Sequence, residues 1–237
     1  MAKNRFWNLD WKIPKIKICG IKTIETAYNA YLLGADALGF HLWSWDCEEL
    51  QKQKIQMFNS ILSYMPEDIS NFLLTDIKDP DKLLYILNKI PNIDTLQIQG
   101  KVAIEELEEI CSILKEKVST LYIVKSIPAT IEDLPFSLRD LENIIDGIVL
   151  DSGWYGGSGR SYSWHKSVKI IRDFTKPVIL AGGLNAKNVK KAIEIIQPYG
   201  VDVETGVEDV IKDKAGNEIK VKNFIKIIEF IKTIRGV

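Results

Sequence analysis

The 237-residue sequence has few cysteines, no excess of either charge and no long apolar run. Its three cysteines, Cys19, Cys47 and Cys111, are too few and too irregularly spaced for a disulfide framework or a zinc motif. The 31 Lys and Arg residues are balanced by 32 Asp and Glu residues, which gives no support for a nucleic-acid partner. No apolar run approaches the roughly 20 residues that a membrane-spanning helix needs. These absences predict a protein of the reducing cytoplasm that binds neither nucleic acid nor membrane.

The chain also has no recognisable targeting segment or internal boundary. Residues Met1 to Trp11 are polar and charged, and they lack the apolar core of a signal peptide. No linker, low-complexity tract or shift in composition divides the remainder. We therefore expect one domain over residues 1–237, with residues 1–14 as an N-terminal extension. Either a monomer or a homodimer is compatible with the sequence.

Short apolar runs alternate with amphipathic stretches along the chain. The expected strands are Lys15–Cys19, Ala37–Trp43, Asn71–Thr75, Thr95–Gln99, Thr120–Lys125, Gly147–Asp151, Pro177–Ala181 and Val201–Thr205. The clearest helical patterns are Ile24–Leu33, Ile104–Leu114, Asn188–Ile196 and Val221–Ile234, with a shorter helix expected at Leu138–Ile144. Strands that alternate with helices indicate βαβ units and a parallel sheet. Eight such units in a chain of this length predict an α/β fold, a single-domain (β/α)8 TIM barrel. A doubly wound sheet is the alternative.

A carboxylate and a glycine-rich loop follow the sixth expected strand. Gly147–Leu150 leads to Asp151, and four of residues 153–159 are glycine. Glycine lets a backbone approach a ligand closely, so that its N–H groups converge on an anion. The pattern predicts an active-site acid followed by an anion-binding loop. A surface turn capped by the aspartate is the alternative.

Two further loops carry glycine at the positions where this fold usually binds phosphate. Gly182 and Gly183 lead into an expected helix with Asn185 as its N-cap, and free N–H groups at a helix start favour a phosphate. Ordinary turn glycines would give the same pattern. The expected phosphate-binding residues are Gly157, Ser158, Gly159, Gly182, Gly183, Thr205, Gly206 and Val207.

The order and spacing of several blocks resemble the phosphoribosylanthranilate isomerase family, although no single block is specific. The blocks are Lys17–Ile21, Gly34–Phe40, Leu96–Gly100, Leu150–Ser152 with Tyr155–Arg160, Trp164, Ala181–Val189, and Val201–Val203 with Gly206–Glu208.

The resemblance implies an Amadori rearrangement of a phosphorylated N-glycosylamine to a 1-amino-1-deoxy-ketose phosphate, a step of tryptophan biosynthesis. Asp151 would be the general acid and Cys19 the general base, with no metal or organic cofactor. An aspartic acid needs a raised pKa for this role, and a thiol needs a lowered one. Taken without the family, a buried cysteine at a strand end is more often inert packing.

The chain departs from the family after the second expected strand. The family has an arginine there that meets the anthranilate carboxylate, whereas this sequence has no arginine between Arg5 and Arg139. The loop Trp43–Glu49 is acidic and aromatic, and Lys52 or Lys54 could reach in. An arginine placed at Asp46 or Cys47 is expected to restore the clamp.

Other positions near the expected site differ as well. Gln99 replaces a family histidine, and we expect Gln97, Gln99 and Trp43 to bind substrate, although Trp43 could instead pack over the barrel rim. Glu204 stands where the family favours a small residue, and we expect it to point away or to pair with Lys187 or Lys212. The two histidines, His41 and His165, are interpreted as core or surface residues.

These observations support three hypotheses. The first is the family reaction on a small phosphorylated sugar substrate. The second is a related barrel isomerase that acts on another phosphorylated sugar amine without the carboxylate. The third is a non-catalytic barrel that binds a phosphate ligand, and the retention of Cys19 and Asp151 argues against it. The missing arginine separates the first hypothesis from the second.

Overall fold

The computed structural model describes residues 5–8, 13–129, 137–153 and 165–236. Eight parallel strands pair in sequence order, and β8 pairs with β1 to close a barrel. The strands are β1 (Lys15–Ile18), β2 (Ala37–His41), β3 (Ser70–Thr75), β4 (Thr95–Ile98), β5 (Tyr122–Pro128), β6 (Gly147–Asp151), β7 (Val178–Leu180) and β8 (Gly200–Val203). This closed barrel confirms the expected (β/α)8 fold and excludes the doubly wound sheet.

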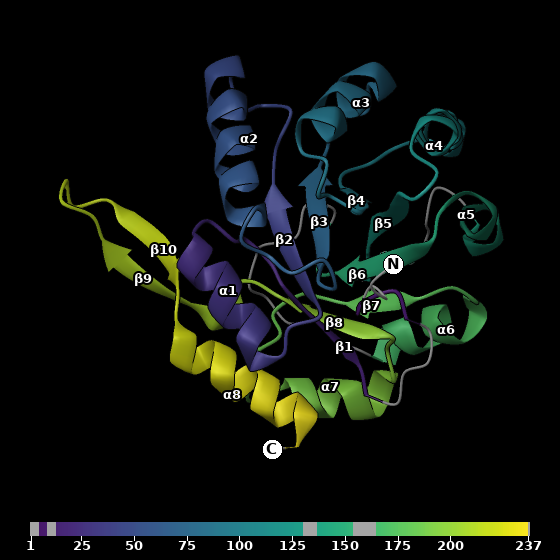
Figure 1. Cartoon of the computed structure of the whole chain (residues 1–237). Helices are drawn as coiled ribbons and strands as arrows, with labels where there is room; N and C mark the ends of the chain where they lie inside the picture. The colour runs from purple at the N-terminus through teal and green to yellow at the C-terminus, as the bar shows by residue number, and fades with distance from the viewer. Residues whose placement is uncertain (1–4, 9–12, 130–136, 154–164, 237) are drawn as a thin grey trace.

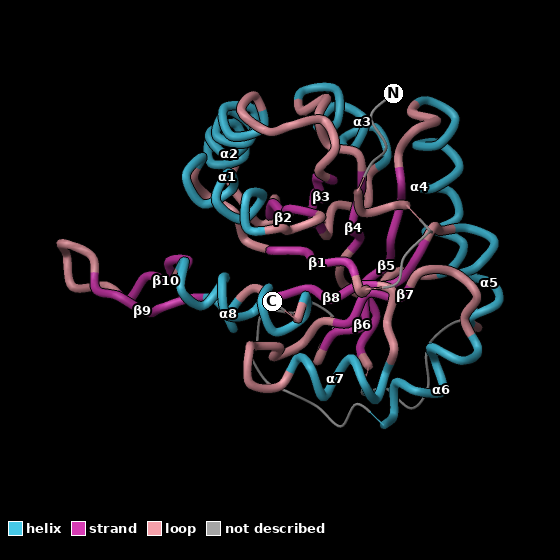
Figure 2. Tube along the Cα trace, turned by 60° about the horizontal axis from the view of Figure 1, so that its bottom comes forward, coloured by secondary structure: helices cyan, strands magenta, loops and turns pink. Residues whose placement is uncertain are grey.

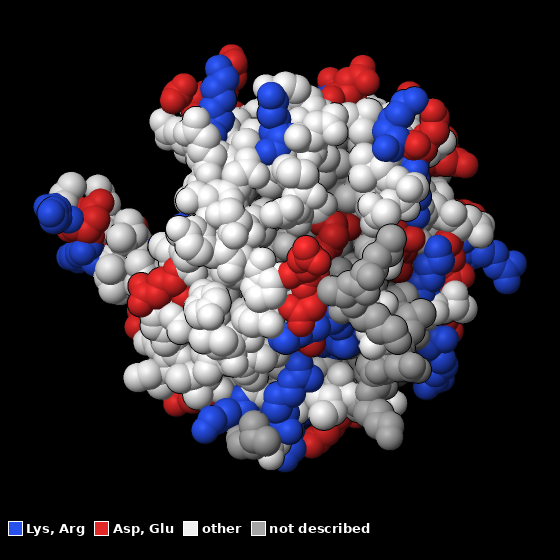
Figure 3. Space-filling model, viewed as in Figure 1, with Lys and Arg blue, Asp and Glu red and all other residues white. Residues whose placement is uncertain are grey.

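Helices follow the strands and surround the barrel (Figure 1). They are α1 (Ile24–Leu33), α2 (Glu48–Leu62), α3 (Pro80–Lys89), α4 (Ile104–Lys117), α5 (Leu138–Ile144), α6 (His165–Asp173), α7 (Val189–Ile196) and α8 (Phe224–Arg235). Lys and Arg side chains are interspersed with Asp and Glu over the outer layer visible in Figure 3. Among the described residues, no helix is both long and apolar enough to cross a bilayer.

Side chains along each strand alternate between the barrel interior and the helical layer. In β1, Ile16 and Ile18 pack in the larger core between strands and helices, whereas Cys19, just beyond the strand, belongs to the inner cluster. Since strand side chains alternate with a period of two, Lys17 faces the interior as well. The same alternation directs the last residue of β2, His41, and the last residue of β6, Asp151, inward. The residues that end or follow the strands are thereby gathered at one mouth of the barrel.

The N-terminal segment closes the other end of the barrel. Phe6 and Trp7 are buried against Phe72 of β3, and the Trp7 indole stacks on Tyr122 with ring centroids 4.5 Å apart. The indole N–H of Trp7 also donates to the Thr95 hydroxyl at 2.8 Å. The extension therefore supplies part of the inner core.

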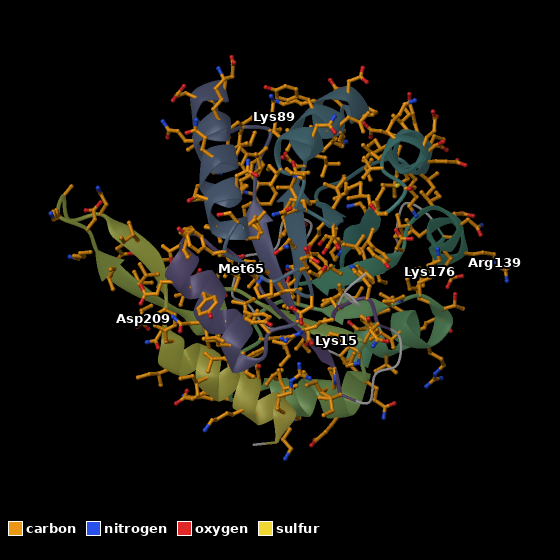
Figure 4. All side chains as sticks on the ribbon, viewed as in Figure 1. Lys15, Met65, Lys89, Arg139, Lys176 and Asp209 are labelled. Atoms are coloured by element: carbon orange, nitrogen blue, oxygen red, sulfur yellow. The ribbon has the colours of Figure 1, made fainter. Side chains whose placement is uncertain are left out.

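A two-stranded hairpin between β8 and α8 was not expected from the sequence. After the short 3₁₀ turn η1 (Thr205–Val207), strands β9 (Glu208–Lys212) and β10 (Glu218–Lys222) pair antiparallel. The hairpin projects away from the barrel in Figures 1 and 2, and Figure 4 shows Asp209 at its base beside α8. There Asp209 pairs with Lys226 at 2.6 Å.

The hairpin had a local signal, because the Asp213 carboxylate accepts the N–H groups of Ala215 and Asn217, as in an Asx turn. Lys220 and Lys222 accordingly belong to β10, and the last helix begins at Phe224 rather than at Val221.

The start of α7 also differs from the expectation. The helix begins at Val189, and Asn188 takes the N-cap position. The Asn185 carboxamide accepts the N–H of Lys187 at 2.9 Å, so Asn185 caps the turn that precedes the helix.

Candidate active site

A cavity of about 210 Å³ lies at the carboxyl ends of the barrel strands. Its lining includes Cys19, His41, Asp151, Asp202 and Glu204. The described lining has three carboxylates and no lysine or arginine. Cys19 and Asp151 therefore line the same cavity, although they are 132 positions apart in the sequence. The other ionisable side chains of the described lining are His41, Asp202 and Glu204.

The Asp151 carboxyl group is 8% exposed, and this burial raises its pKa from 3.8 to about 6. The backbone N–H and the hydroxyl of Ser152 both donate to Asp151 Oδ1, at 2.5 and 3.0 Å, and act in the opposite direction. Burial outweighs these two hydrogen bonds because the ionised form loses its hydration. A fraction of Asp151 is thus protonated near neutral pH, as a general acid requires.

The pKa of Cys19 is shifted in the direction opposite to the one that a general base requires. The thiol is 2% exposed, and burial raises its pKa well above the ordinary range of a cysteine. The neighbouring ammonium of Lys17, which is buried and bonded to Asp202 at 2.8 Å, lowers the pKa but does not compensate. Burial therefore acts against the lowered pKa that the base role requires, although a cation does stand beside the sulfur.

His41 was missed as a site residue. Its Nε2 lies 3.2 Å from Cys19 Sγ and 3.4 Å from Glu204 Oε2. Burial lowers the pKa of the imidazole, and the nearby Glu204 carboxylate acts against this effect. The signal was the alternation in β2: Leu38 and Phe40 pack in the outer core, so His41 must face inward.

The partner of Glu204 also differs from the expectation. Its carboxylate oxygen contacts His41 Nε2 at 3.4 Å, and it forms no ion pair with Lys187 or Lys212 among the described residues. Lys222 contacts the backbone of Glu204 instead, by donating to its carbonyl at 3.1 Å.

The expected phosphate loops are only partly within the described residues. Gly157, Ser158 and Gly159 lie outside them, whereas Gly182, Gly183 and Thr205 line the cavity. At Gly206 a Cβ would stand 1.9 Å from the carbonyl oxygen of Leu184, so the two loops touch through glycine.

Val207, the last of the expected phosphate-binding residues, is fully buried. Its N–H donates to the Glu204 carbonyl at 3.3 Å.

The three expected substrate-binding residues line the cavity. Gln97 and Gln99 are 1% and 2% exposed, and the Oε1 atom of each has no hydrogen-bond partner among the described residues. A buried amide oxygen without a partner is costly, so a ligand that donates to these oxygens would be stabilised there. Trp43 stacks on Trp45 with ring centroids 4.9 Å apart, and it borders the cavity rather than only packing over the rim.

Two acidic side chains of the loop after β2 are paired with lysines, so they contribute less negative charge to the site than the sequence indicates. Asp46 is buried, accepts the N–H of Trp43 at 2.9 Å and pairs with Lys54 at 2.5 Å. Glu48 pairs with Lys52 on the exposed surface of α2. Lys52 is thereby excluded as a clamp, and an arginine at position 46 would remove the contacts that hold this loop.

A second groove of about 470 Å³ adjoins the cavity and shares His41 and Trp43 with it. Its walls are largely apolar, with Ile21, Leu50, Met57 and Phe58 among them. Two cations line it, Lys22 and Lys54, and Lys22 forms no ion pair with any described residue. The groove therefore combines apolar surface with a cation available to an anionic group.

Fold and cavity together define a (β/α)8-barrel enzyme with acid–base groups at the carboxyl ends of its strands. The model of the N-(5'-phosphoribosyl)anthranilate (PRA) isomerase family matches residues 16–227. N-(5'-phosphoribosyl)anthranilate isomerase 1 of Methanosarcina mazei is 33% identical over 228 residues, which cover 90% of this chain and 93% of that protein.

Solved structures agree with this relationship. The phosphoribosyl anthranilate isomerase of Thermotoga maritima is 26% identical, with a TM-score of 0.70 over 95% of this chain and 100% of that chain. A second such isomerase, 24% identical with a TM-score of 0.68 and the same coverage, was solved in complex with reduced 1-(o-carboxyphenylamino)-1-deoxyribulose 5-phosphate. The chain belongs to the N-(5'-phosphoribosyl)anthranilate isomerase family, and it is an isomerase of that type.

Proposed function

We propose that the substrate is N-(5'-phosphoribosyl)anthranilate itself, that Asp151 is the general acid and that Cys19 is the general base. The observation that carries this assignment is the placement of both side chains in one cavity, with the pKa of Asp151 raised to about 6. The reaction isomerises the aminoaldose phosphate to the 1-amino-1-deoxy-ketose phosphate.

Ring opening is the task of Asp151. Its carboxyl proton passes to the furanose ring oxygen, the C1–O bond breaks and a Schiff base forms between C1 and the anthranilate nitrogen. Ser152 donates two hydrogen bonds to Oδ1 and so orients the carboxyl group. These bonds also stabilise the carboxylate that remains after the transfer.

Proton removal from C2 is the task of Cys19. The electrons of the C2–H bond move into the C1–C2 bond, and the enolamine that results tautomerises to the ketose. A thiolate is needed, and the Lys17 ammonium stabilises it from inside the barrel. His41 Nε2, 3.2 Å from Sγ, is the nearest group that could take the thiol proton.

Binding of the two ends of the substrate follows from the two adjoining spaces. The phosphate is assigned to the backbone of Gly182, Gly183 and Gly206, together with residues 157–159. The anthranilate ring is assigned to the apolar groove, with its carboxylate beside Lys22. A lysine is a point charge without the planar fork of an arginine, so this end is held less firmly than by a guanidinium.

The test is the loss of anthranilate fluorescence after the protein is added to freshly made phosphoribosylanthranilate. An analogue that carries aniline in place of anthranilate tests the carboxylate. Turnover of the natural substrate, abolished in Asp151→Asn and Cys19→Ser, supports the proposal. Turnover of the aniline analogue alone would favour an isomerase for another phosphorylated sugar amine.

We also propose the domain organisation, the oligomeric state and the cellular location of the protein. We assign residues 1–237 to one domain, because Phe6 and Trp7 of the extension 1–14 are built into its inner core. A monomer or a homodimer is expected, and size-exclusion chromatography with light scattering distinguishes them. The cytoplasm is the proposed location, because Cys19, Cys47 and Cys111 are all free thiols.

A further inference from the structure

Three metal-ligand atoms converge at the edge of the cavity. Cys19 follows β1, His41 ends β2 and Glu204 follows β8, and these strands are neighbours in the closed barrel. The Sγ, an imidazole nitrogen and a carboxylate oxygen of these residues all lie within 4.8 Å of one another. Nε2 of His41 is the centre of the group, 3.2 Å from Sγ and 3.4 Å from Oε2.

A single nitrogen serves two neighbours in this arrangement. Nε2 carries either one hydrogen or one lone pair, yet both the sulfur and the carboxylate approach it. A hydrogen on Nε2 would be shared between the sulfur and the carboxylate, whereas a lone pair that accepts from the thiol would face the carboxylate. A cation among the three atoms would interact favourably with each of them.

The loop after Cys19 leaves room for the carboxylate in this position. Gly20 has φ +73°, and a Cβ at that residue would stand 2.7 Å from Glu204 Oε1. A side chain at residue 20 would therefore displace the carboxylate from the loop that follows Cys19.

The local charge favours a cation as well. Asp151, Asp202 and Glu204 line the cavity, while the two nearest lysines are already paired. Lys17 is bonded to Asp202 at 2.8 Å, and Lys222 to Glu208 at 2.9 Å. With Asp202 neutralised by Lys17, the carboxylate that remains beside the sulfur and the imidazole is that of Glu204.

We propose that Cys19, His41 and Glu204 form a binding site for a zinc-type divalent cation, and that its occupation inhibits the isomerase. A thiolate and an imidazole select Zn²⁺ or Co²⁺ over Mg²⁺ and Ca²⁺, which prefer oxygen ligands. Three protein ligands leave a fourth position open to the cavity. The donors are far apart in the sequence, which is why cysteine spacing alone did not indicate the site.

Inhibition follows from the use of the sulfur. Coordination forms a metal–sulfur bond and releases the thiol proton to solvent, so the lone pair that would accept the C2 proton is no longer available. The metal is thus an inhibitor and not a cofactor. Only this consequence rests on the proposed function; metal binding itself does not.

The test is a titration of the metal-free protein with Co²⁺, followed by its thiolate charge-transfer absorption. We expect one Co²⁺ per chain, displaced by Zn²⁺ and not by Mg²⁺. His41→Ala and Glu204→Gln should each weaken binding at least tenfold, and Cys19→Ser should abolish the charge-transfer band. Cys111→Ser, which removes the other buried thiol, is the matched control and should bind as the wild type does.

Two outcomes would overturn the site: no thiolate band in the wild type, or binding that His41→Ala and Glu204→Gln leave unchanged. Glu204→Gln is isosteric and decides the matter if His41→Ala does not fold, as judged by circular dichroism. Zinc should also inhibit turnover of phosphoribosylanthranilate, and Glu204→Gln should need at least tenfold more zinc relative to its own metal-free rate. Zinc that binds without inhibiting would overturn the inhibitory role. Co²⁺ binding in a protein without isomerase activity would refute the proposed function alone.

Discussion

The acid side and the thiol side of the cavity respond differently to the same physical effect. Burial raises the pKa of Asp151 to about 6, which keeps part of it protonated and suits a general acid. Burial also raises the pKa of Cys19, which opposes the thiolate that a general base requires. The acid side is complete with Asp151 and its neighbour Ser152, whereas the thiol side is surrounded by Lys17, His41 and Glu204. Burial by itself favours a protonated acid, but a thiol base needs additional charged neighbours.

The largest expected effect comes from removing either reacting group. Asp151→Asn and Cys19→Ser should each lower kcat by about 10²–10⁴, because a general acid or base contributes about this factor. Steady-state assays on phosphoribosylanthranilate measure it, with circular dichroism as a check on folding. Near-normal turnover in one variant would show that only the other side of the cavity performs chemistry.

The difference in stability between Asp151→Asn and the wild type should depend on pH. A carboxyl pKa raised from 3.8 to about 6 means that ionisation costs the folded state roughly 3 kcal/mol. The stability linked to the neutral carboxyl is fully present below pH 3.8 and is lost as the pH rises through about 6. Asp151→Asn should therefore gain stability over the wild type between pH 4 and pH 7 in urea titrations. A constant difference across this range would contradict the raised pKa.

The thiol side can be tested by alkylation. Cys19 is buried with a raised pKa, as is Cys111, whose pKa is raised to about 12, whereas Cys47 is exposed. At pH 7.5 iodoacetamide should modify Cys47 at least tenfold faster than either buried thiol. Mass spectrometry of the three peptides over time measures the rates. Cys19 reacting as fast as Cys47 would mean that Lys17 and His41 already maintain a thiolate in the free protein.

A smaller effect is expected in the groove beside the thiol side. Lys22→Ala should raise KM about tenfold and change kcat little, because a charge-assisted hydrogen bond contributes roughly 1.5–3 kcal/mol. Lys52→Ala is the control, since Lys52 pairs with Glu48 outside this groove. Equal KM values for Lys22→Ala and the wild type would mean that Lys22 does not bind the substrate carboxylate, and Lys54 would be the remaining cation of the groove to test.

The smallest expected effect concerns the loop after β2. Asp46→Asn should lower the free energy of unfolding by about 1–2 kcal/mol, because it weakens the bonds from Trp43 and Lys54. Glu48→Gln, on the exposed surface, should have no measurable effect. Urea unfolding of both variants makes the comparison. Equal stabilities would mean that Asp46 does not hold the loop.

The sequence by itself determined the fold and placed Asp151 and Cys19 at the ends of strands. Eight apolar runs that alternate with helical patterns predicted a parallel sheet covered by helices, and their number favoured the closed barrel, although only the observed pairing of β8 with β1 excluded a doubly wound sheet. The expected helices at residues 24–33 and 138–144 agree with the observed bounds. The hairpin at residues 208–222 was not predicted because its strands are mostly exposed and carry no buried apolar run. The aspartate at position 213 was the one local indication of its turn.

Only the tertiary structure decided the surroundings of the thiol. His41 and Glu204 are distant in sequence, and nothing local distinguishes a histidine that packs from one that lies beside a buried sulfur. Closure of β8 against β1 brings them together, and the degree of burial there fixes the direction of the Cys19 pKa. The same holds for Asp46, which lies in an acidic loop of the sequence and which the structure shows buried in an ion pair with the partly exposed Lys54. Composition and periodicity depend on near neighbours along the chain, whereas desolvation and charge pairing depend on neighbours in space.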